Sequence, residues 1–477
     1  MNGSATASVL ACIVGSAVFE PGLVAQTAAR VPGPFPAQAA GWGPPAGGGL
    51  QYARWAEDWS AAREQGAAPP GKAMPLGGDT SLTLSGESRL RANHYTNARL
   101  VDGDEYTEGL WRGVLGADLH FGDHVRFYGE LAHGDVAGGP DDPAPNIAND
   151  VAANQAFVDV RSDLGGSLVG AMVGRQEFAD GPRQLLGLGD GANLHRTWNG
   201  VRGYLHGENA RVGVFALWAT RFGSGGFDEH IDGDERLYGA SGSIVLARGD
   251  RGATTFMEPF WLSSRVPDVR LHDEVRDDRR DTPGVRLWGK DGRVGFDTTV
   301  AYQVGRRGDR GVDAWGVFAI HDVLLTEGSC RPQATLRVDV ATGGGSGGGA
   351  VHTFHPLYTS SSYLGEGRLL SLSNLLLVSP GFAIAPTADT KLSIEYGFAW
   401  RFANDDAVYG GGLRAYPGTA AARGDEIGRM LRVEGRWNAP KNVVFAFGYE
   451  RLETGDVLDR AGLPAADYAF VSVTVRY

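Results

Sequence analysis

The chain is poor in cysteine and in long apolar runs. Its 477 residues include only two cysteines, Cys12 and Cys330, too few for a disulfide framework or a cysteine-based zinc site. Beyond the N-terminal region, charged residues interrupt every apolar stretch before it reaches the roughly 20 residues that a membrane-spanning helix needs. These absences exclude a disulfide-stapled domain and a helical membrane protein.

Positive charge is also in short supply. The sequence has 44 Lys+Arg against 56 Asp+Glu, a formal net charge of −12, and this acidity argues against nucleic acid as the main partner. Apolar residues make up 42% of the chain, which excludes a disordered protein. The 72 glycines, the aromatic residues and the lack of long helical patterns favour a β protein.

The N-terminal 79 residues differ from the rest. Residues 1–29 are predicted to form a secretory signal, with an apolar core over Val9–Phe19 followed by small residues. Because no Lys or Arg precedes Arg30, either the signal is atypical or the true start codon lies upstream. Residues 30–79 are rich in Pro, Gly and Ala and predict a periplasmic lead-in without a core of its own, containing one short helix within Tyr52–Glu64.

From residue 80 to 477 the chain alternates between apolar and polar residues in short segments. In Lys391–Arg401 the apolar face carries Leu392, Ile394 and Trp400, whereas the other face carries charge. A strand of a soluble protein also alternates, so one segment decides nothing. Here, however, aromatic residues gather at strand ends on the apolar face and charges lie in mid-strand on the other face. This combination is typical of outer-membrane β-barrels.

Eighteen such segments are predicted, an even number as single-chain bacterial barrels require. Short turns are expected at Phe121–His124, Lys290–Gly292 and Asn438–Lys441. The sequence thus predicts an all-β fold: a single antiparallel transmembrane barrel of about 18 strands with long extracellular loops and short periplasmic turns. A barrel of this size leaves an aqueous lumen, and hence a pore. The predicted strands begin near residues 80, 107, 124, 153, 168, 199, 210, 235, 252, 283, 293, 311, 331, 374, 390, 425, 441 and 467, and long loops are predicted over 135–151, 222–234, 264–282, 343–368 and 403–424.

The last strand alternates up to a terminal aromatic residue, Tyr477. Bacterial outer-membrane barrels commonly end in such a strand, which their assembly machinery recognises. The alternative is the closing strand of a soluble β domain. The expected partners are therefore the barrel assembly machinery, outer-membrane lipid and lipopolysaccharide. The expected location is the outer membrane of a Gram-negative bacterium.

Arginine dominates the polar strand faces, because lysine occurs only at positions 72, 290, 391 and 441. Guanidinium groups stay charged at any working pH and pair bidentately with carboxylates. We expect lumen carboxylates to hold these arginines in cross-strand pairs, which either makes the pore anion-selective or is purely structural. The arginines are Arg89, Arg91, Arg126, Arg161, Arg401, Arg432 and Arg436, and the carboxylates are Glu87, Glu130, Asp159, Glu177, Glu395 and Glu434.

No catalytic arrangement is visible in the sequence. His352 and His355 lie in a Gly-rich loop without an adjacent carboxylate, so no metal site is predicted. The run Gly343–Gly349 lacks the Gly-Lys-Ser/Thr and the helix of a phosphate-binding loop, and we interpret it as a flexible loop able to narrow the lumen. Neither an enzymatic activity nor a cofactor is expected.

Several segments resemble the alginate export family of outer-membrane barrels, in family order and over about residues 52–477. The most specific segment is Val173–Phe178, followed by Arg196–Arg202. One departure is clear: where the family has an Arg-Arg-Ser/Thr-Phe stretch, this chain has His195-Arg196-Thr197-Trp198. The other similar segments are Trp55–Ser60, Lys72–Gly77, Leu84–Arg89, Asp180–Gly181, Asp190–Asn193, Ala341–Gly343, Thr353–Tyr358, Ser362–Gly365, Trp400–Arg401, Asp405–Tyr409 and Ala466–Tyr468.

The resemblance implies a monomeric 18-stranded barrel with an Arg-rich constriction. It also implies outward passage of an anionic uronate polymer, gated by a periplasmic turn and an extracellular loop. The matching arginines carried over as constriction residues are Arg89, Arg175, Arg196, Arg202 and Arg401. Arg175, Arg196 and Arg202 could instead brace a loop folded into the lumen.

Three functions follow as hypotheses. The first is export of an acidic, alginate-like exopolysaccharide, with periplasmic secretion components as further candidate partners. The second is a selective uptake porin for small anionic or aromatic nutrients. The third, a barrel that anchors a surface enzyme or adhesin, has little support because no nucleophile–base arrangement is present.

Overall fold

A computed structural model describes residues 50–51, 54–179, 184–248, 254–360 and 362–477. The predicted signal peptide lies outside the described residues, as do residues 30–49 and 52–53 of the lead-in. None of the helices in the described part of the chain is long and apolar enough to cross a membrane.

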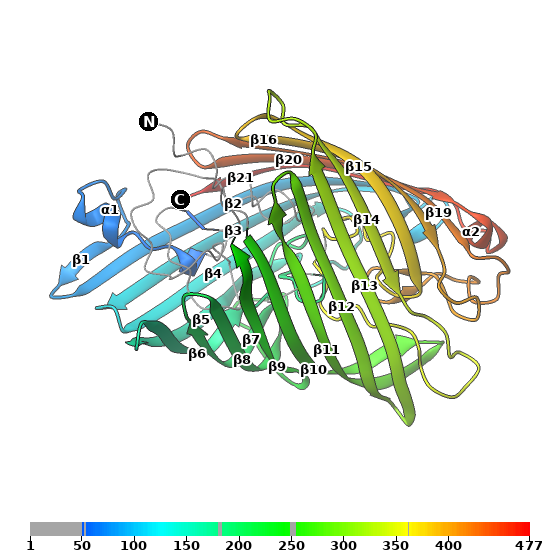
Figure 1. The fold of residues 1–477 in the computed structure, drawn as a ribbon, viewed down its shortest axis with the longest axis horizontal. Helices are drawn as coiled ribbons and strands as arrows, with labels where there is room; N and C mark the ends of the chain where they lie inside the picture. The colour runs from blue at the N-terminus through cyan, green and yellow to red at the C-terminus, as the bar shows by residue number, and fades with distance from the viewer. Residues whose placement is uncertain (1–49, 52–53, 180–183, 249–253, 361) are drawn as a thin grey trace.

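Eighteen antiparallel strands form one closed barrel (Figure 1). Each strand pairs with its neighbour in sequence order, and β2 closes the sheet by pairing with β21, for example Arg89 with Thr474. A short strand, β1 (Met74–Gly77), adds to the start of β2. The barrel strands are β2 (Thr80–Thr96), β3 (Tyr106–Phe121), β4 (Val125–Gly138), β5 (Asn149–Leu164), β6 (Ser167–Glu177), β7 (Thr197–His206), β8 (Ala210–Arg221), β9 (His230–Arg248), β10 (Thr254–Leu271), β11 (Glu274–Asp291), β12 (Val294–Arg307), β13 (Arg310–Leu324), β14 (Gln333–Ala341), β15 (Leu375–Thr387), β16 (Thr390–Trp400), β19 (Glu426–Ala439), β20 (Val443–Thr454) and β21 (Ala466–Arg476).

The 18 predicted strands are confirmed, and most begin within a few residues of the predicted position. The predicted loop over 264–282 is wrong, because only His272 and Asp273 separate β10 from β11. That stretch is dense in charges, which suggested a loop. In the structure these charges alternate across the sheet: Asp278 and Arg280 are buried, whereas Arg279 is exposed.

Side chains alternate between the barrel wall's two faces as a period of two requires. On β2, Leu90 is 57% exposed on the outer surface, whereas its neighbour Arg89 is 4% exposed and faces the lumen. The connections are short at one end of the barrel and mostly long at the other. In bacterial barrels the short turns are periplasmic and the long loops extracellular.

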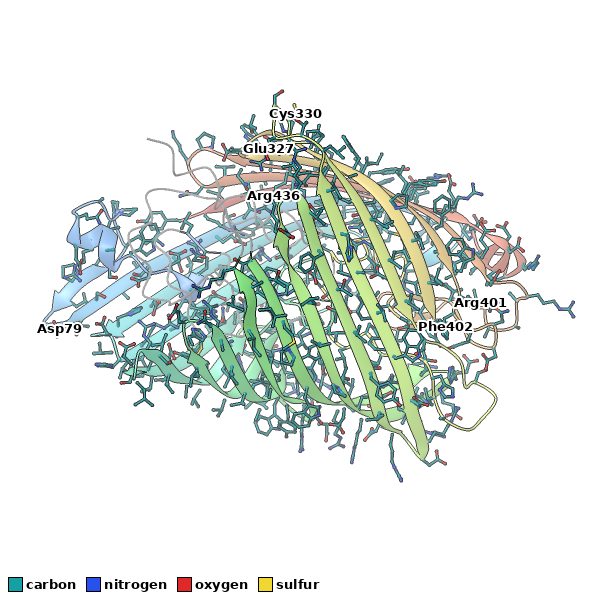
Figure 2. All side chains as sticks on the ribbon, in the orientation of Figure 1. Asp79, Glu327, Cys330, Arg401, Phe402 and Arg436 are labelled. Atoms are coloured by element: carbon teal, nitrogen blue, oxygen red, sulfur yellow. The ribbon has the colours of Figure 1, made fainter. Side chains whose placement is uncertain are left out.

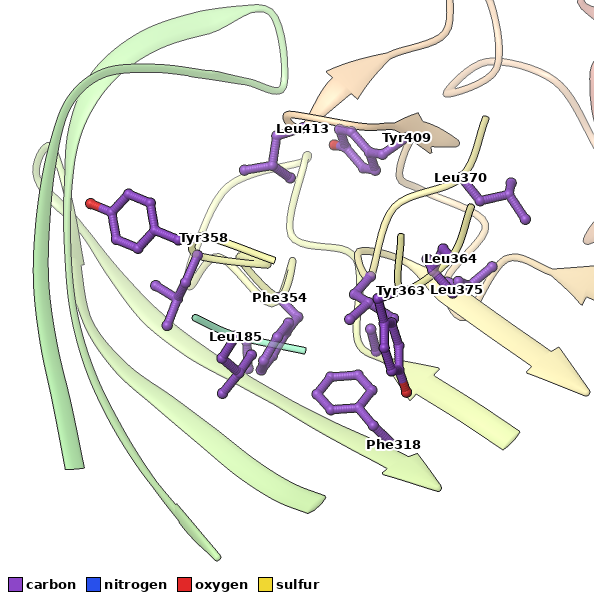
Figure 3. Packing of buried hydrophobic residues seen from close by; sticks show 14 of the residues in the cluster. Leu185, Phe318, Phe354, Tyr358, Tyr363, Leu364, Leu370, Leu375, Tyr409 and Leu413 are labelled. Carbon is purple, nitrogen blue, oxygen red and sulfur yellow. The ribbon is translucent and has the colours of Figure 1, made fainter. Parts of the chain in front are cut away.

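Three segments from the long-loop end fold into the barrel: residues 178–196, 342–374 and 401–425, within their described parts. Their apolar side chains pack on the wall as one buried cluster that includes Leu185, Phe354, Tyr358, Tyr363 and Phe318 (Figure 3). The prediction of a simply aqueous lumen is therefore wrong for this half of the barrel, which holds a packed core. The sequence pattern of the strands could not reveal it, because the core is built from loops.

The first two inserted loops join each other inside the barrel. Leu186 and Tyr358 form a parallel β-bridge, in which Tyr358 N donates to Leu185 O at 2.8 Å and Gly187 N to Tyr358 O at 2.7 Å. The third loop carries a small hairpin of β17 (Tyr409–Gly410) and β18 (Arg414–Ala415). Smaller helical turns, η3 (Ala98–Leu100) and α2 (Asp456–Arg460), lie in two other connections at the same end.

The described part of the lead-in also enters the barrel. It contains a 3-10 turn, η2 (Arg54–Ala56), and a short helix, α1 (Ser60–Glu64). Trp55 is fully buried and packs edge-on against Phe157 of β5, with 5.9 Å between ring centroids. The described part of the segment thus packs on the lumen wall.

The lead-in is also tied to the periplasmic rim. Arg54 donates a hydrogen bond to the backbone oxygen of Tyr477, the last residue. Lys72 Nζ donates to Glu57 Oε2 at 3.0 Å and to Leu84 O at 2.8 Å. The N-terminal segment and the C-terminal strand therefore meet at the same mouth of the barrel.

Candidate functional site

The lumen wall carries a charge network that begins on β2 and β3. Arg112 donates to Asp190 Oδ1 at 2.7 Å and also pairs with Glu87. Arg89 donates to the backbone oxygens of Asp190 and Ala192, both at 2.6 Å. Glu87 in turn accepts from Arg476 Nε at 2.8 Å. This network therefore connects strands β2, β3 and β21 to the inserted loop 178–196.

His195 lies at the centre of this network. Its Nδ1 contacts Glu177 Oε1 at 2.5 Å and its Nε2 contacts Asp190 Oδ1 at 2.7 Å. Burial alone would lower the pKa of His195, but the Glu177 carboxylate and the two hydrogen bonds outweigh it and raise this pKa to about 9. His195 is therefore a cation at neutral pH, at the position where the chain departs from the family's arginine.

A small cavity lies between the lead-in and the inserted loop. Among the described residues, the amide oxygens of Asn154 and Asn193 have no hydrogen-bond donor. The cavity has a volume of about 20 Å³, which is room for about one water molecule able to donate to these oxygens. The lining residues are Arg54, Glu87, Arg112, Val114, Glu130, Ala132, Asn154, Glu177, Asn193 and His195.

A second network lies on β14, β16 and β19. Arg432 contacts Glu434 Oε1 at 2.8 Å and Glu395 Oε2 at 3.3 Å. Arg337 reaches the same Glu395 oxygen at 3.2 Å, and its guanidinium lies 4.7 Å from the ring centroid of Tyr363. Since Tyr363 belongs to the inserted loop 342–374, this network also joins the wall to a loop.

Arg175, a predicted site residue on β6, contacts the connection between two other strands. Arg175 donates to Glu229 Oε1 at 2.7 Å, in the connection between β8 and β9. The preceding residue, Gly174, has a φ of +131°. A Cβ at this position would lie 2.3 Å from the backbone oxygen of Ala156. A glycine is thus required just before Arg175, because any side chain would collide with the neighbouring strand.

Arg196 and Arg202 contact inserted segments. Arg196 Nη1 donates to Gly187 O at 3.1 Å, and its guanidinium lies 4.9 Å from the ring centroid of Tyr358. Arg202 lies 5.1 Å from the ring centroid of Trp55. These contacts match the bracing alternative for both arginines.

Arg401 and Arg436 lie apart from both networks, at opposite ends of the barrel (Figure 2). Arg401 donates to backbone oxygens of its own loop, including Thr419 O and Ala422 O, each at 2.8 Å. Arg436 donates to Asn438 Oδ1 at 3.2 Å, beside a periplasmic turn. The predicted arginines therefore do not form one ring.

Asp159 joins two other wall residues. Its Oδ1 accepts from Tyr204 OH at 2.8 Å and its Oδ2 lies 3.3 Å from Arg126 Nη2. Arg126 in turn donates to Trp55 O at 2.7 Å, which connects this pair to the lead-in. Asp159 is thus buried among wall residues that contact the lead-in.

Four members of these networks were not predicted from the sequence: Arg112, Arg337, Asp190 and His195. For Arg112 a signal existed, since it follows the outward-facing Trp111 in an alternating strand. Asp190 and His195 gave no such signal, because their contacts depend on a loop entering the barrel. In the described part of the chain no group of three His, Cys, Asp or Glu side chains is arranged to hold a metal ion.

Comparisons of structure place this fold among outer-membrane porins of Pseudomonas aeruginosa. OpdQ matches with a TM-score of 0.55 at 10% identity, over 83% of this chain and 98% of that chain. OccK2 (OpdF), solved in complex with glucuronate, matches with a TM-score of 0.54 at 12% identity, over 83% and 97%. OccD3 (OpdP) matches with 0.54 at 12% identity, over 85% and 94%. At these identities the likeness establishes the fold alone.

Comparison of sequence is more specific. A search of curated proteins gave no match. The alginate export family model matches residues 80–472, which is the barrel from its first strand into its last. Family and fold together establish an outer-membrane channel of a Gram-negative bacterium. The chain belongs to the alginate export family of outer-membrane β-barrel proteins.

Proposed function

We propose that this channel exports an acidic, alginate-like exopolysaccharide. The observation that carries the proposal is the pair Arg89 and Arg112, whose guanidinium groups hold Asp190 of an inserted loop within the lumen. A uronate unit presents a carboxylate of the same chemistry, so it can compete with Asp190 for these arginines. Family membership supports a polymer of this class.

Export of a polymer requires the inserted loops to move, because their packed side chains fill the extracellular half of the lumen. In this mechanism each uronate replaces a loop contact as it enters and is released to the next arginine. Several weak binding sites in series allow the polymer to pass through the channel without being trapped, because each uronate dissociates from one arginine as readily as it binds. Arg432 and Arg337 supply the second group of cations along the wall.

The second candidate is selective uptake of a small anionic nutrient. The specific observation that favours it is the packing of the inserted loops in the extracellular half of the lumen, which leaves less room for a polymer than for a small solute. The similarity in fold to OccK2, solved with glucuronate, is compatible with this candidate as well.

Single-channel recording in planar bilayers tests both candidates. Under a KCl gradient we expect anion selectivity, and we expect oligouronates of increasing length to block the current with increasing residence time. Replacing Arg112→Gln and Arg432→Gln should weaken both effects, whereas the outward-facing Arg429→Gln should change neither. Cation selectivity would refute the Arg-lined path, and block by monomeric acids with no gain from chain length would favour uptake.

A further inference from the structure

Four arginines form a row on the outer surface near the extracellular end of the barrel. They lie on β9, β10, β11 and β12, which are side by side in the wall (Figure 1). Arg236 pairs in register with Arg265, Arg265 with Arg279, and Arg279 with Arg306. Residues paired in this way have Cβ atoms about 4.5–5.5 Å apart, and like charges there are destabilising. A row of this kind needs negative charge from some source.

The row lies just beyond the aromatic girdle of the barrel. On the outer face of β10, β12 and β13, Trp261, Tyr302 and Trp315 are 46%, 43% and 40% exposed. Arg306 follows Tyr302 and Val304 on the same face of β12. Aromatic girdles mark the boundary between the apolar membrane interior and the headgroups. The arginines are therefore at the level of the headgroups of the outer leaflet.

The carboxylates around the row already have partners. Asp277 contacts Arg265 at 3.3 Å, Asp281 accepts from Trp261 Nε1 at 3.2 Å, and Asp313 accepts from Tyr302 OH at 2.8 Å. Arg265 also lies 3.7 Å from Asp234, and Arg236, at the β9 end of the row, donates to Gly233 O at 2.7 Å.

The other end of the row, on β11 and β12, differs. Arg279 and Arg306 are exposed neighbours, and within the described residues neither one makes an ion pair. Two adjacent guanidinium groups without a carboxylate present a fork of donors toward the headgroup layer.

The other side of the barrel is different. There the outward-facing Arg429 of β19 pairs in register with Glu453, and Arg451 contacts Asp467 Oδ2 at 2.9 Å. These arginines also lie near the extracellular end, but acidic residues of the neighbouring strands balance them. The unbalanced pair is thus a feature of one side, not of the whole rim.

We propose that Arg279 and Arg306, flanked by Arg265 and Arg236, bind a phosphate group of lipopolysaccharide in the outer leaflet. The outer leaflet of a Gram-negative outer membrane consists of this glycolipid, whose headgroup carries phosphates at the level of the girdle. Guanidinium groups bind phosphate through bidentate, charge-assisted hydrogen bonds. The apolar surface below, which includes Val300 and Trp261, lies against the acyl chains. The site is independent of the solute that the lumen carries.

Native mass spectrometry of the full chain, purified in detergent, tests the site with diphosphorylated lipid A as the probe. The double variant Arg279→Gln/Arg306→Gln should bind it about tenfold more weakly or worse. The matched control Arg429→Gln/Arg451→Gln should bind like the wild type. Dephosphorylated lipid A should bind equally to all three proteins, because the apolar contacts remain.

A heat-modifiability shift on a gel establishes that each variant forms a closed barrel. Arg279→Lys/Arg306→Lys keeps the charge without the fork, so its affinity should fall between wild type and the Gln variant. Unchanged binding in the Gln variant, or an equal loss in the control, would overturn the proposal. Competition by inorganic phosphate as strong as that of the lipid would identify an anion site only and would overturn the lipid assignment.

Discussion

Arg112 on the barrel wall donates a 2.7 Å hydrogen bond to Asp190 Oδ1 on a loop that enters from the extracellular end. The same oxygen lies 2.7 Å from His195 Nε2. One loop carboxylate therefore connects wall and loop, in a position that a solute carboxylate can also occupy. Under the proposed function, the inserted loop and an anionic solute compete for the same cations.

The first prediction concerns this carboxylate. Asp190→Asn replaces charge-assisted hydrogen bonds with neutral ones and should weaken loop attachment by about 1–2 kcal/mol. We expect a larger time-averaged conductance in planar bilayers, since the loop leaves the lumen more often. Asp141→Asn, an exposed loop substitution, is the control and should behave like the wild type. A lower conductance in Asp190→Asn would show that this carboxylate does not hold the loop.

The second prediction concerns pH. The pKa of His195 is raised from 6.5 to about 9, so the protonated imidazole stabilises the inserted loop. This contribution is complete below about pH 6.5 and is lost as the pH rises through 9. We expect the conductance to increase between pH 8 and 10.

Two variants check the pH prediction. His195→Gln is neutral throughout and should have the high-pH conductance already at pH 7, with little further change. His195→Arg keeps the positive charge and should remain in the low-conductance state up to pH 10. An unaltered pH response in both variants would assign the titration to another group.

The third prediction concerns Trp55. Its indole is buried against Phe157 and lies below the guanidinium groups of Arg126 and Arg202. Trp55→Ala removes an aromatic packing contact of about 3–5 kcal/mol, which should release the lead-in from the periplasmic mouth. We expect faster trypsin cleavage at the exposed Arg63 with the barrel intact. Trp437→Ala, on the outer surface, should not change the cleavage rate.

Much of the barrel was predictable from sequence, because the alternation of apolar and polar residues is a property of each strand by itself. Alternation such as Leu90 outside and Arg89 inside repeats in nearly every strand, since each strand separates lipid from lumen. Local pattern failed at β10 and β11, where a charged hairpin extends beyond the membrane and its outer face no longer needs to be apolar. The contacts of Arg89 with Asp190 were not predictable, because they join residues about 100 positions apart through an inserted loop.

The last prediction concerns Arg401, one of the predicted constriction residues. Its buried guanidinium donates to the oxygens of Thr419, Ala422 and Asp406, which fastens the ends of the loop 401–425. Arg401→Gln leaves several of these oxygens without donors, at about 1–3 kcal/mol for each one that remains buried. Hydrogen–deuterium exchange should therefore rise at amides of this loop, such as Tyr416 N, and stay unchanged in β16. The exposed Arg423→Gln should leave exchange in the same loop as in the wild type. If Arg401→Gln instead changed ion selectivity without changing exchange, Arg401 would line the conduction path, and its contacts with the loop would be incidental to the loop's stability.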